Sequence, residues 1–171
     1  MENTTFNKML LKTGFCCMAS DGHIDDKEIS LLKNHFAKLN DSSSIDLIND
    51  INDLLAELNS NPQKFLHDFF DFIKISKFSK NETLSILEIA LNIILADDKI
   101  EYSEIKFFKN IRHRLQISDA EICSNFSNIA EIESFLEADI INESSLSSLT
   151  SHFIDNISFP TFAKINIGNS F

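Results

Sequence analysis

A stretch of this chain occurs twice, 76 positions apart, and the repeat limits the folds that the sequence can adopt. Residues 21–39 align with residues 97–115 without a gap. The identical pairs are Asp21/Asp97, Ile24/Ile100, Glu28/Glu104, Ile29/Ile105, Lys33/Lys109, Asn34/Asn110 and Leu39/Leu115. Each copy is typical of an apolar helix, an acidic loop and then an amphipathic helix. The repeat therefore predicts two helical hairpins that stack about a pseudo-two-fold axis around a shared core.

Helical spacing also runs through most of the remaining chain. Apolar residues recur at i, i+3, i+4 and i+7, and Asp, Asn and Ser clusters interrupt them. A sheet-rich fold with many tight turns would need more than 3 glycines and 2 prolines. The 16 phenylalanines suggest a core that is built largely from this residue. We predict helices at 5–20, 26–39, 44–59, 62–76, 80–96, 102–116 and 119–126, weaker ones at 129–139 and 144–156, and an extended stretch at 159–167. The predicted fold class is all-α: a compact helical bundle of two pseudo-symmetric helical hairpins plus a C-terminal helical appendage.

Charge and composition change toward the end of the chain. Residues 118–171 contain 1 basic and 8 acidic side chains, and the segment around 143–148 is rich in serine. We therefore divide the chain into a helical domain at 1–125 and an acidic, Ser-rich C-terminal appendage at 126–171. Because the two hairpins hold most of the apolar periodicity, we expect residues 1–125 to fold cooperatively on their own.

The acidic loops have an interpretable local chemistry. Gly22 permits a left-handed residue that ends the first helix. Asp25 is placed to cap the next helix, and Glu28 is placed to complete the capping box. In the second copy, Asp98 replaces the glycine and Glu101, a poorer cap, replaces the aspartate.

The two loops together are a candidate cation site. Their motif matches the second half of an EF-hand loop, but Cys17 and Ala19 occupy the first and third ligand positions, so an EF-hand is disfavoured. If the hairpins pack as the repeat implies, carboxylates from both loops meet, and such oxygens suit Ca²⁺ or Mg²⁺. The alternative is that these residues only cap helices and solvate loops. The candidate metal ligands are Asp21, Asp25, Asp97, Asp98 and Glu101.

The sequence around both loops resembles the TerB-like family of tellurite-resistance proteins. The matching segments are residues 18–28 (MASDGHIDDKE), 95–104 (LADDKIEYSE) and 115–121 (LQISDAE), so the resemblance covers about residues 8–125. That family shares its domain with the N-terminal region of a membrane-anchored DnaJ-like co-chaperone. The resemblance implies an all-α fold, a cytoplasmic location and work with partner proteins, membrane-associated ones among the candidates, in stress or tellurite response. It also implies divalent-cation binding through the paired acidic loops, and no catalysis.

Several classes of function are disfavoured by composition. A net charge of −11 argues against nucleic-acid binding, which depends on Lys and Arg at phosphates. The longest apolar stretch, residues 84–96, is too short to span a bilayer, so no direct membrane insertion is expected. Cys16, Cys17 and Cys123 show no pattern of disulfide or redox chemistry, which favours a reducing, cytoplasmic compartment. No catalytic motif occurs, and we predict that the protein is not an enzyme.

The remaining polar features have two interpretations each. His23 is either a metal ligand or an exposed loop residue, and His67 with Asp71 forms either a metal pair or a polar helix face. The helix predicted at 102–116 carries five basic residues, which could bind an acidic partner or the protein's own acidic tail, or could form a solvated face whose stems cover apolar surface. These residues are Lys106, Lys109, Arg112, His113 and Arg114. The leading hypothesis is a non-enzymatic binding domain with a divalent-cation site. The alternative is a metal-independent protein–protein interaction module of co-chaperone or scaffold type.

Overall fold

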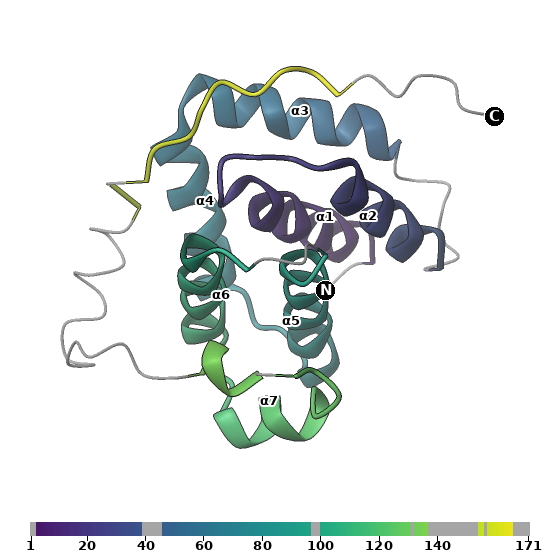
Figure 1. The fold of residues 1–171 in the computed structure, drawn as a ribbon, viewed down its shortest axis with the longest axis vertical. Helices are drawn as coiled ribbons and strands as arrows, with labels where there is room; N and C mark the ends of the chain where they lie inside the picture. Colours follow the sequence, from purple (N-terminus) through teal and green to yellow (C-terminus); the bar gives the residue numbers. More distant parts are fainter. Residues whose placement is uncertain are drawn as a thin grey trace.

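The computed structural model describes residues 3–38, 46–96, 100–130, 132–136, 154–155 and 157–165. Over this part of the chain the structure contains seven α-helices, one 3₁₀ helix and no strand, which confirms the all-α prediction (Figure 1). In chain order they are α1 (Asn3–Ala19), α2 (Asp26–Lys38), α3 (Leu47–Ser60), α4 (Pro62–Ile75), α5 (Lys80–Ile94), α6 (Tyr102–Leu115), α7 (Asp119–Asn125) and the 3₁₀ helix η1 (Ile132–Phe135).

The helix ends follow from local capping chemistry. Ser79 and Ser118 each accept a hydrogen bond from the backbone three residues on and form capping boxes at the starts of α5 and α7. Asn61 caps α4, whose first residue is Pro62, as the sequence predicts. These seven helices therefore lie close to their predicted ranges.

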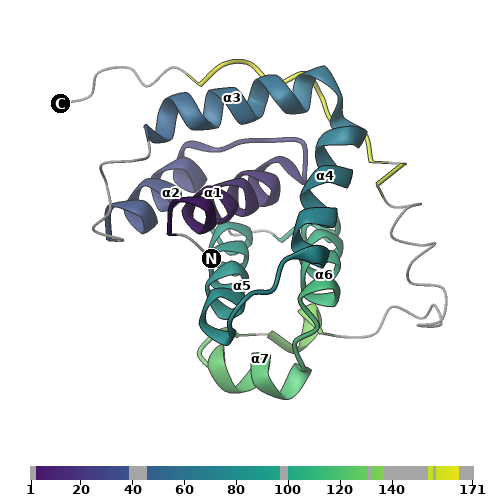
Figure 2. The same cartoon turned by 180° about the vertical axis from the view of Figure 1, so that it is seen from behind.

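The C-terminal region is less helical than the sequence predicts. In place of a helix at 129–139, the described part of that range contains only η1. The helix predicted at 144–156 falls mostly outside the described residues. Residues 157–165 are not helical, in agreement with the extended segment predicted there, and they run along α3 (Figures 1 and 2).

The two repeat copies form the α1–α2 and α5–α6 hairpins, and α1 packs directly against α5. The first helix of each copy also contacts the second helix of the other, through the α1·α6 and α2·α5 contacts. These reciprocal contacts are those expected of a pseudo-two-fold arrangement. α3 and α4 are inserted between the copies: α3 packs on α1, and α4 packs on α6 (Figure 2).

The core is built largely from phenylalanine. Phe69 and Phe107 stack with their ring centroids 6.1 Å apart, and Phe15 meets Phe65 edge-on at 6.0 Å. Residues beyond 125 join this core: Phe126 and Ile132 are buried, and Phe135 packs edge-on against Phe108 at 5.4 Å. Whether 1–125 folds without them stays a prediction. Among the described residues, no helix is both long enough and apolar enough to cross a membrane.

Candidate functional site in the two acidic loops

The first acidic loop begins where α1 ends. The Gly22 amide donates to the Ala19 carbonyl at 3.0 Å, and Gly22 has φ +87°, the left-handed conformation predicted for it. The Asp21 carboxylate accepts a hydrogen bond from the His23 amide at 2.8 Å. The local turn therefore uses one oxygen of Asp21 and holds that side chain on the loop.

Asp25 begins α2 as a helix cap. Its carboxylate accepts from the Lys27 amide at 2.8 Å, and its own amide donates to Glu28 Oε2 at 2.8 Å. The Glu28 half of the predicted capping box is therefore present, whereas Asp25 accepts from the amide at the second helical position rather than from Glu28 at the third. The carboxylate of Asp25 thus has a structural role at the exposed start of α2.

The second acidic loop repeats part of this arrangement at the start of α6. The Glu101 amide donates to Glu104 Oε2 at 2.6 Å, as the Asp25 amide donates to Glu28 in the first copy. Asp97 and Asp98, two of the predicted metal ligands, lie outside the described residues. Of the predicted set, the structure therefore describes Asp21, Asp25 and Glu101.

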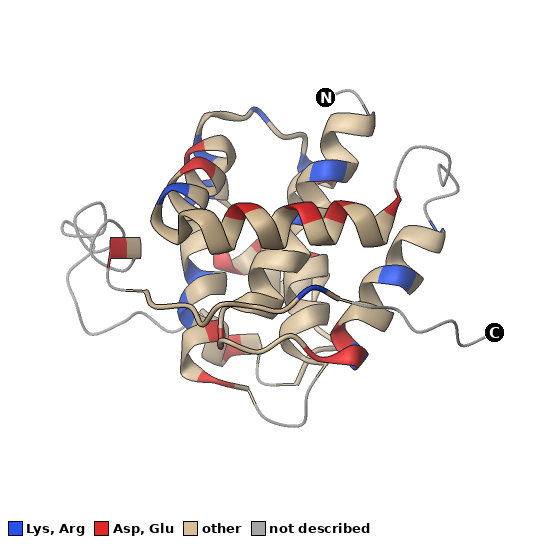
Figure 3. Ribbon diagram, turned by 90° about the horizontal axis from the view of Figure 1, so that it is seen from above, with Lys and Arg blue, Asp and Glu red and all other residues tan. Residues whose placement is uncertain are grey.

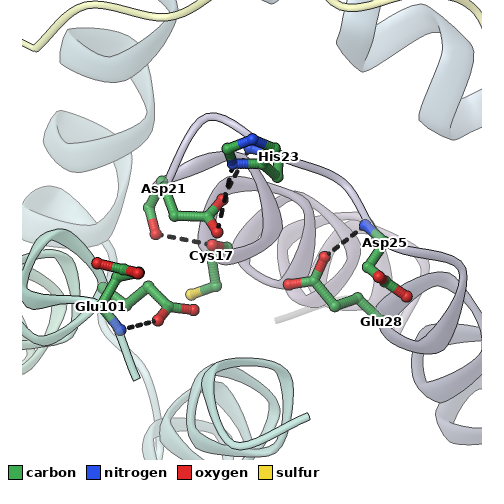
Figure 4. A network of polar contacts seen from close by, with 8 residues as sticks. Cys17, Asp21, His23, Asp25, Glu28 and Glu101 are labelled. Atoms are coloured by element: carbon green, nitrogen blue, oxygen red, sulfur yellow. Dashed lines mark hydrogen bonds and ion pairs between the residues drawn. The ribbon is translucent and has the colours of Figure 1, made fainter. Parts of the chain in front are cut away.

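The helix starts of the two copies converge on Cys17. Burial raises the pKa of the Cys17 thiol well above 9.0, and the nearby carboxylates of Glu104 and Glu28 raise it further. Both glutamates are buried, at 5% and 6% exposure. Figure 4 shows Cys17 together with Asp21, Asp25 and Glu28 of the first loop and Glu101 of the second. The starts of α2 and α6 thus lie in the same region, and whether the complete acidic loops meet there stays a prediction.

The burial of Glu28 and Glu104 is the feature that sequence reasoning missed. Each occupies the third position of its helix and satisfies the backbone amide of the preceding cap residue. Their identity in the repeat was the available signal, because a surface cap tolerates substitution more readily than a buried one. The protonated Cys17 thiol between them is unsuited to act as a nucleophile.

The chemistry of the described loop residues fits a hard cation, although their arrangement does not by itself form a site. Asp21, Asp25 and Glu101 supply carboxylate oxygens, the ligands that Ca²⁺ and Mg²⁺ prefer. Within the described residues, no group of three or more His, Cys, Asp or Glu side chains is arranged to hold a metal ion. A complete ligand set from these loops would thus require Asp97 and Asp98.

The two histidines of interest lie apart from any such group. The His23 side chain is 87% exposed and lies 3.8 Å from the Asp21 carboxylate through its Nδ1. His67 Nε2 lies 3.2 Å from Asp155 Oδ1, in the C-terminal region, so its partner is not the Asp71 that the helical spacing suggested. His67 therefore helps to anchor the C-terminal region to α4.

The basic side chains of α6 serve mainly within the fold. Arg112 pairs with Asp119 at the start of α7. The Arg114 guanidinium lies 4.3 Å from the centre of the Phe70 ring, and burial lowers the pKa of Arg114 to about 10. Lys106 similarly lies over Tyr102 at 4.5 Å. These contacts support the prediction that the basic stems cover apolar surface.

Taken together, the fold and the loops define an all-helical domain built from two pseudo-symmetric hairpins with acidic loops. A model of the family described as tellurite resistance protein TerB matches residues 10–124, which is well over half of the chain. The chain therefore belongs to the TerB family, as its sequence resemblance implied. No curated protein and no solved structure matches it. Residues 126–171 lie outside the family match.

Proposed function

We propose that this TerB-family chain is a non-enzymatic, cytoplasmic binding protein of the tellurite or stress response. It works with protein partners, membrane-associated ones among them, and binds Ca²⁺ or Mg²⁺ weakly through its paired acidic loops. The observation that carries the proposal is the position of both helix starts near Cys17: α1 contacts both α2 and α6, and Figure 4 shows Asp21 of the first loop and Glu101 of the second around this residue. We expect this arrangement to bring the equivalent acidic loops of the two copies into one region of the molecule.

The proposed ligands are the carboxylates of Asp21, Asp25 and Glu101, with Asp97 and Asp98 completing the set. Helix capping uses one oxygen of a carboxylate and leaves the other able to coordinate a cation. The cation would neutralise repulsion between acidic loops that the fold holds together. Its role in this proposal is to stabilise the loops in one conformation for a partner.

Thermal unfolding in Ca²⁺ or Mg²⁺ tests the cation site. At a hundredfold excess over Kd, a ligand specific to the folded state adds about 2.7 kcal/mol, which raises Tm by about 5–10 °C in a chain of this length. The test variant is Asp21→Asn with Asp97→Asn, because Asn retains a hydrogen-bond acceptor while each change removes a charge. We expect this variant to lose the cation-dependent rise in Tm.

The matched control removes the same two charges elsewhere. Asp53→Asn with Glu133→Gln changes exposed carboxylates on α3 and η1. This control should keep the full cation-dependent shift. Equal shifts in the test and control variants, or no shift in the wild type, would contradict the cation site.

The second candidate is a metal-independent protein–protein interaction module. It is favoured by the observation that Asp21 and Asp25 already have structural roles, as acceptors of backbone hydrogen bonds in the first loop. A protein that captures the same partners in excess chelator as in Ca²⁺ would support this alternative. Loss of those partners in chelator would support the cation-dependent proposal instead.

A further inference from the structure

Two asparagines of α3 hold the backbone of a segment more than a hundred residues away in sequence. The Asn59 side chain accepts from the Phe162 amide at 3.0 Å and donates to the Phe162 carbonyl at 2.9 Å. Asn52 makes the same two bonds to Ile165, at 3.0 Å from its amide and 3.3 Å to its carbonyl. Figures 1 and 2 show the C-terminal segment, residues 157–165, running beside α3 from both sides of the molecule.

The spacing of these contacts fits an extended peptide on a helix. Asn52 and Asn59 are seven residues apart, which corresponds to about 10.5 Å along an α-helix. Phe162 and Ile165 are three residues apart, which corresponds to about 9–10 Å in an extended or polyproline II chain. The two distances match, so both asparagines can bind the segment at the same time. Because Asn52 binds Ile165 and Asn59 binds Phe162, the C-terminal segment runs antiparallel to α3.

The C-terminal segment presents its side chains on two sides. Ile157, Phe159, Phe162 and Ile165 are half-buried and pack against the core, and the last three recur every third residue. That period is the one of polyproline II. Between them lie exposed side chains, including Pro160, which meets the first acidic loop: a Cβ added at Gly22 would lie 3.4 Å from Pro160 Cδ.

The two elements differ in charge, but this difference does not make the contact. α3 carries Asp50, Asp53 and Glu57 and no Lys or Arg, as the helix nearest the viewer in Figure 3 shows. The C-terminal segment carries Lys164 and no acidic residue. The acidic side chains of α3 do not face the segment: Glu57 Oε2 lies 3.7 Å from Lys12 Nζ of α1. Asp50, Asp53 and Glu57 lie about 100° or more around the helix from Asn52 and Asn59, so the contact depends on the asparagine bonds and on apolar packing.

We propose that the face of α3 bearing Asn52 and Asn59 is a docking site for extended peptides, and that residues 157–165 are its tethered occupant. An extended segment of a partner protein, apolar at every third residue, binds there in place of the protein's own segment. Because the asparagines bind backbone groups, recognition depends on conformation and spacing more than on sequence. The proposal does not depend on cation binding at the acidic loops.

The contacts that keep the C-terminal segment on α3 allow another peptide to replace it. None of its side chains is fully buried, whereas Ile154, just before it, is 2% exposed. The pairing of His67 with Asp155 also precedes it, so residues 157–165 can leave while Ile154 and Asp155 stay anchored. A tether of this kind gives an effective concentration of about millimolar, which favours the chain's own segment over that of a second copy at micromolar protein.

Amide hydrogen exchange on the full chain tests the contact directly. The amides of Phe162 and Ile165 should exchange more slowly than those of Ala163 and Lys164, because they donate to asparagine. Asn52→Ala with Asn59→Ala should remove this protection. Asn92→Ala, an exposed asparagine on α5, is the matched control and should leave it unchanged. Equal exchange at all four wild-type amides would overturn the proposal.

A peptide-binding experiment tests whether another peptide can replace the C-terminal segment on α3. The probe is a fluorescent peptide of residues 157–165 (ISFPTFAKI), added to a full chain in which Phe159→Ser and Phe162→Ser weaken its own segment. We expect submillimolar binding to this variant and at least roughly tenfold weaker binding to the wild type, whose tethered segment competes. Adding Asn52→Ala or Asn59→Ala to the variant should weaken binding about tenfold, because each asparagine makes two hydrogen bonds.

Changes in the peptide separate backbone from side-chain recognition. N-methylation of the amide at position 162 or 165 keeps every side chain and should weaken binding about tenfold. A second peptide with apolar residues at the same three-residue spacing should bind comparably, and a scrambled one should not.

Three outcomes would overturn the proposal. A folded variant that binds no peptide would show that the C-terminal segment is only structural. Global unfolding of the Phe159→Ser, Phe162→Ser chain would show that the segment is integral to the fold. A wild-type dimer that grows with protein concentration and disappears in the asparagine variants would show that the occupant comes from a second copy.

Discussion

Among the described residues, Gly22 and Gln116 have positive φ, at +87° and +54°, and they allow opposite tests. Gly22→Ala should lower the free energy of unfolding by about 1–2 kcal/mol, because a Cβ disfavours the left-handed region. Gln116→Gly, at the end of α6, should raise it by up to about 1 kcal/mol for the same reason. Urea denaturation measures both changes. A Gly22→Ala chain as stable as the wild type would contradict the left-handed conformation of this residue.

A second residue-scale prediction concerns acid and His35. Burial lowers the pKa of His35 below 6.5, and nearby Glu88 partly opposes that shift. His35 Nε2 is buried without a hydrogen-bond partner in the part of the chain that the structure describes. The unfolded chain therefore takes up a proton at higher pH than the folded chain does. The stability that this contributes is complete above about pH 6.5 and is lost as the pH falls through that value toward the lower folded pKa.

The measurement is the urea midpoint of the wild type and of His35→Gln between pH 7 and pH 5. His35→Gln should reduce the loss of stability over this interval, because Gln does not titrate. The effect should be modest, since the side chain is only half-buried. The same pH dependence in both proteins would assign the acid sensitivity to other groups.

At the scale of elements, the inserted pair α3 and α4 breaks the symmetry of the two hairpins. Leu31 of α2 and Phe107 of α6 occupy equivalent positions in the repeat, yet Leu31 is 37% exposed and Phe107 is fully buried. The reason is α4, which packs Phe69 and Phe70 against Phe107. Equivalent sequence positions therefore have different environments.

This asymmetry predicts unequal effects of equivalent substitutions. Phe107→Ala should lower the free energy of unfolding by about 3–5 kcal/mol, because it leaves a cavity in the core. Leu31→Ala should lower it by less than about 1 kcal/mol, because water already reaches this side chain. Chemical denaturation of both variants provides the comparison. Similar losses would indicate that Leu31 is covered in solution.

At the scale of the whole molecule, residues beyond 125 complete the core. Phe126, Ile132 and Phe135 are buried, and Phe135 is fully enclosed against Phe108. Shortening the chain from 136 to 125 should therefore cost at least about 3 kcal/mol, the cost of removing one buried phenylalanine. Circular dichroism and urea denaturation of chains ending at 125 and at 136 measure the difference. Equal stability of the two would support a folded unit that ends at 125.

The sequence by itself determined the helices, their caps and the pairing of the two hairpins. Periodic apolar spacing and helix caps such as Asp25 with Glu28 depend on residues within one or two turns, so a local pattern predicts them. The repeat added one long-range inference, that the two hairpins pack on each other, because similar hairpins bury their apolar faces together.

Only the tertiary structure decided which side chains those elements bury and where the C-terminal segment docks. The placement of Glu28 and Glu104 beside Cys17 depends on how three helices cross. The bonds from Asn52 to Ile165 and from Asn59 to Phe162 join residues 113 and 103 positions apart. No local pattern in the sequence pairs such positions, because contacts of this range arise only when the packed core brings distant segments together.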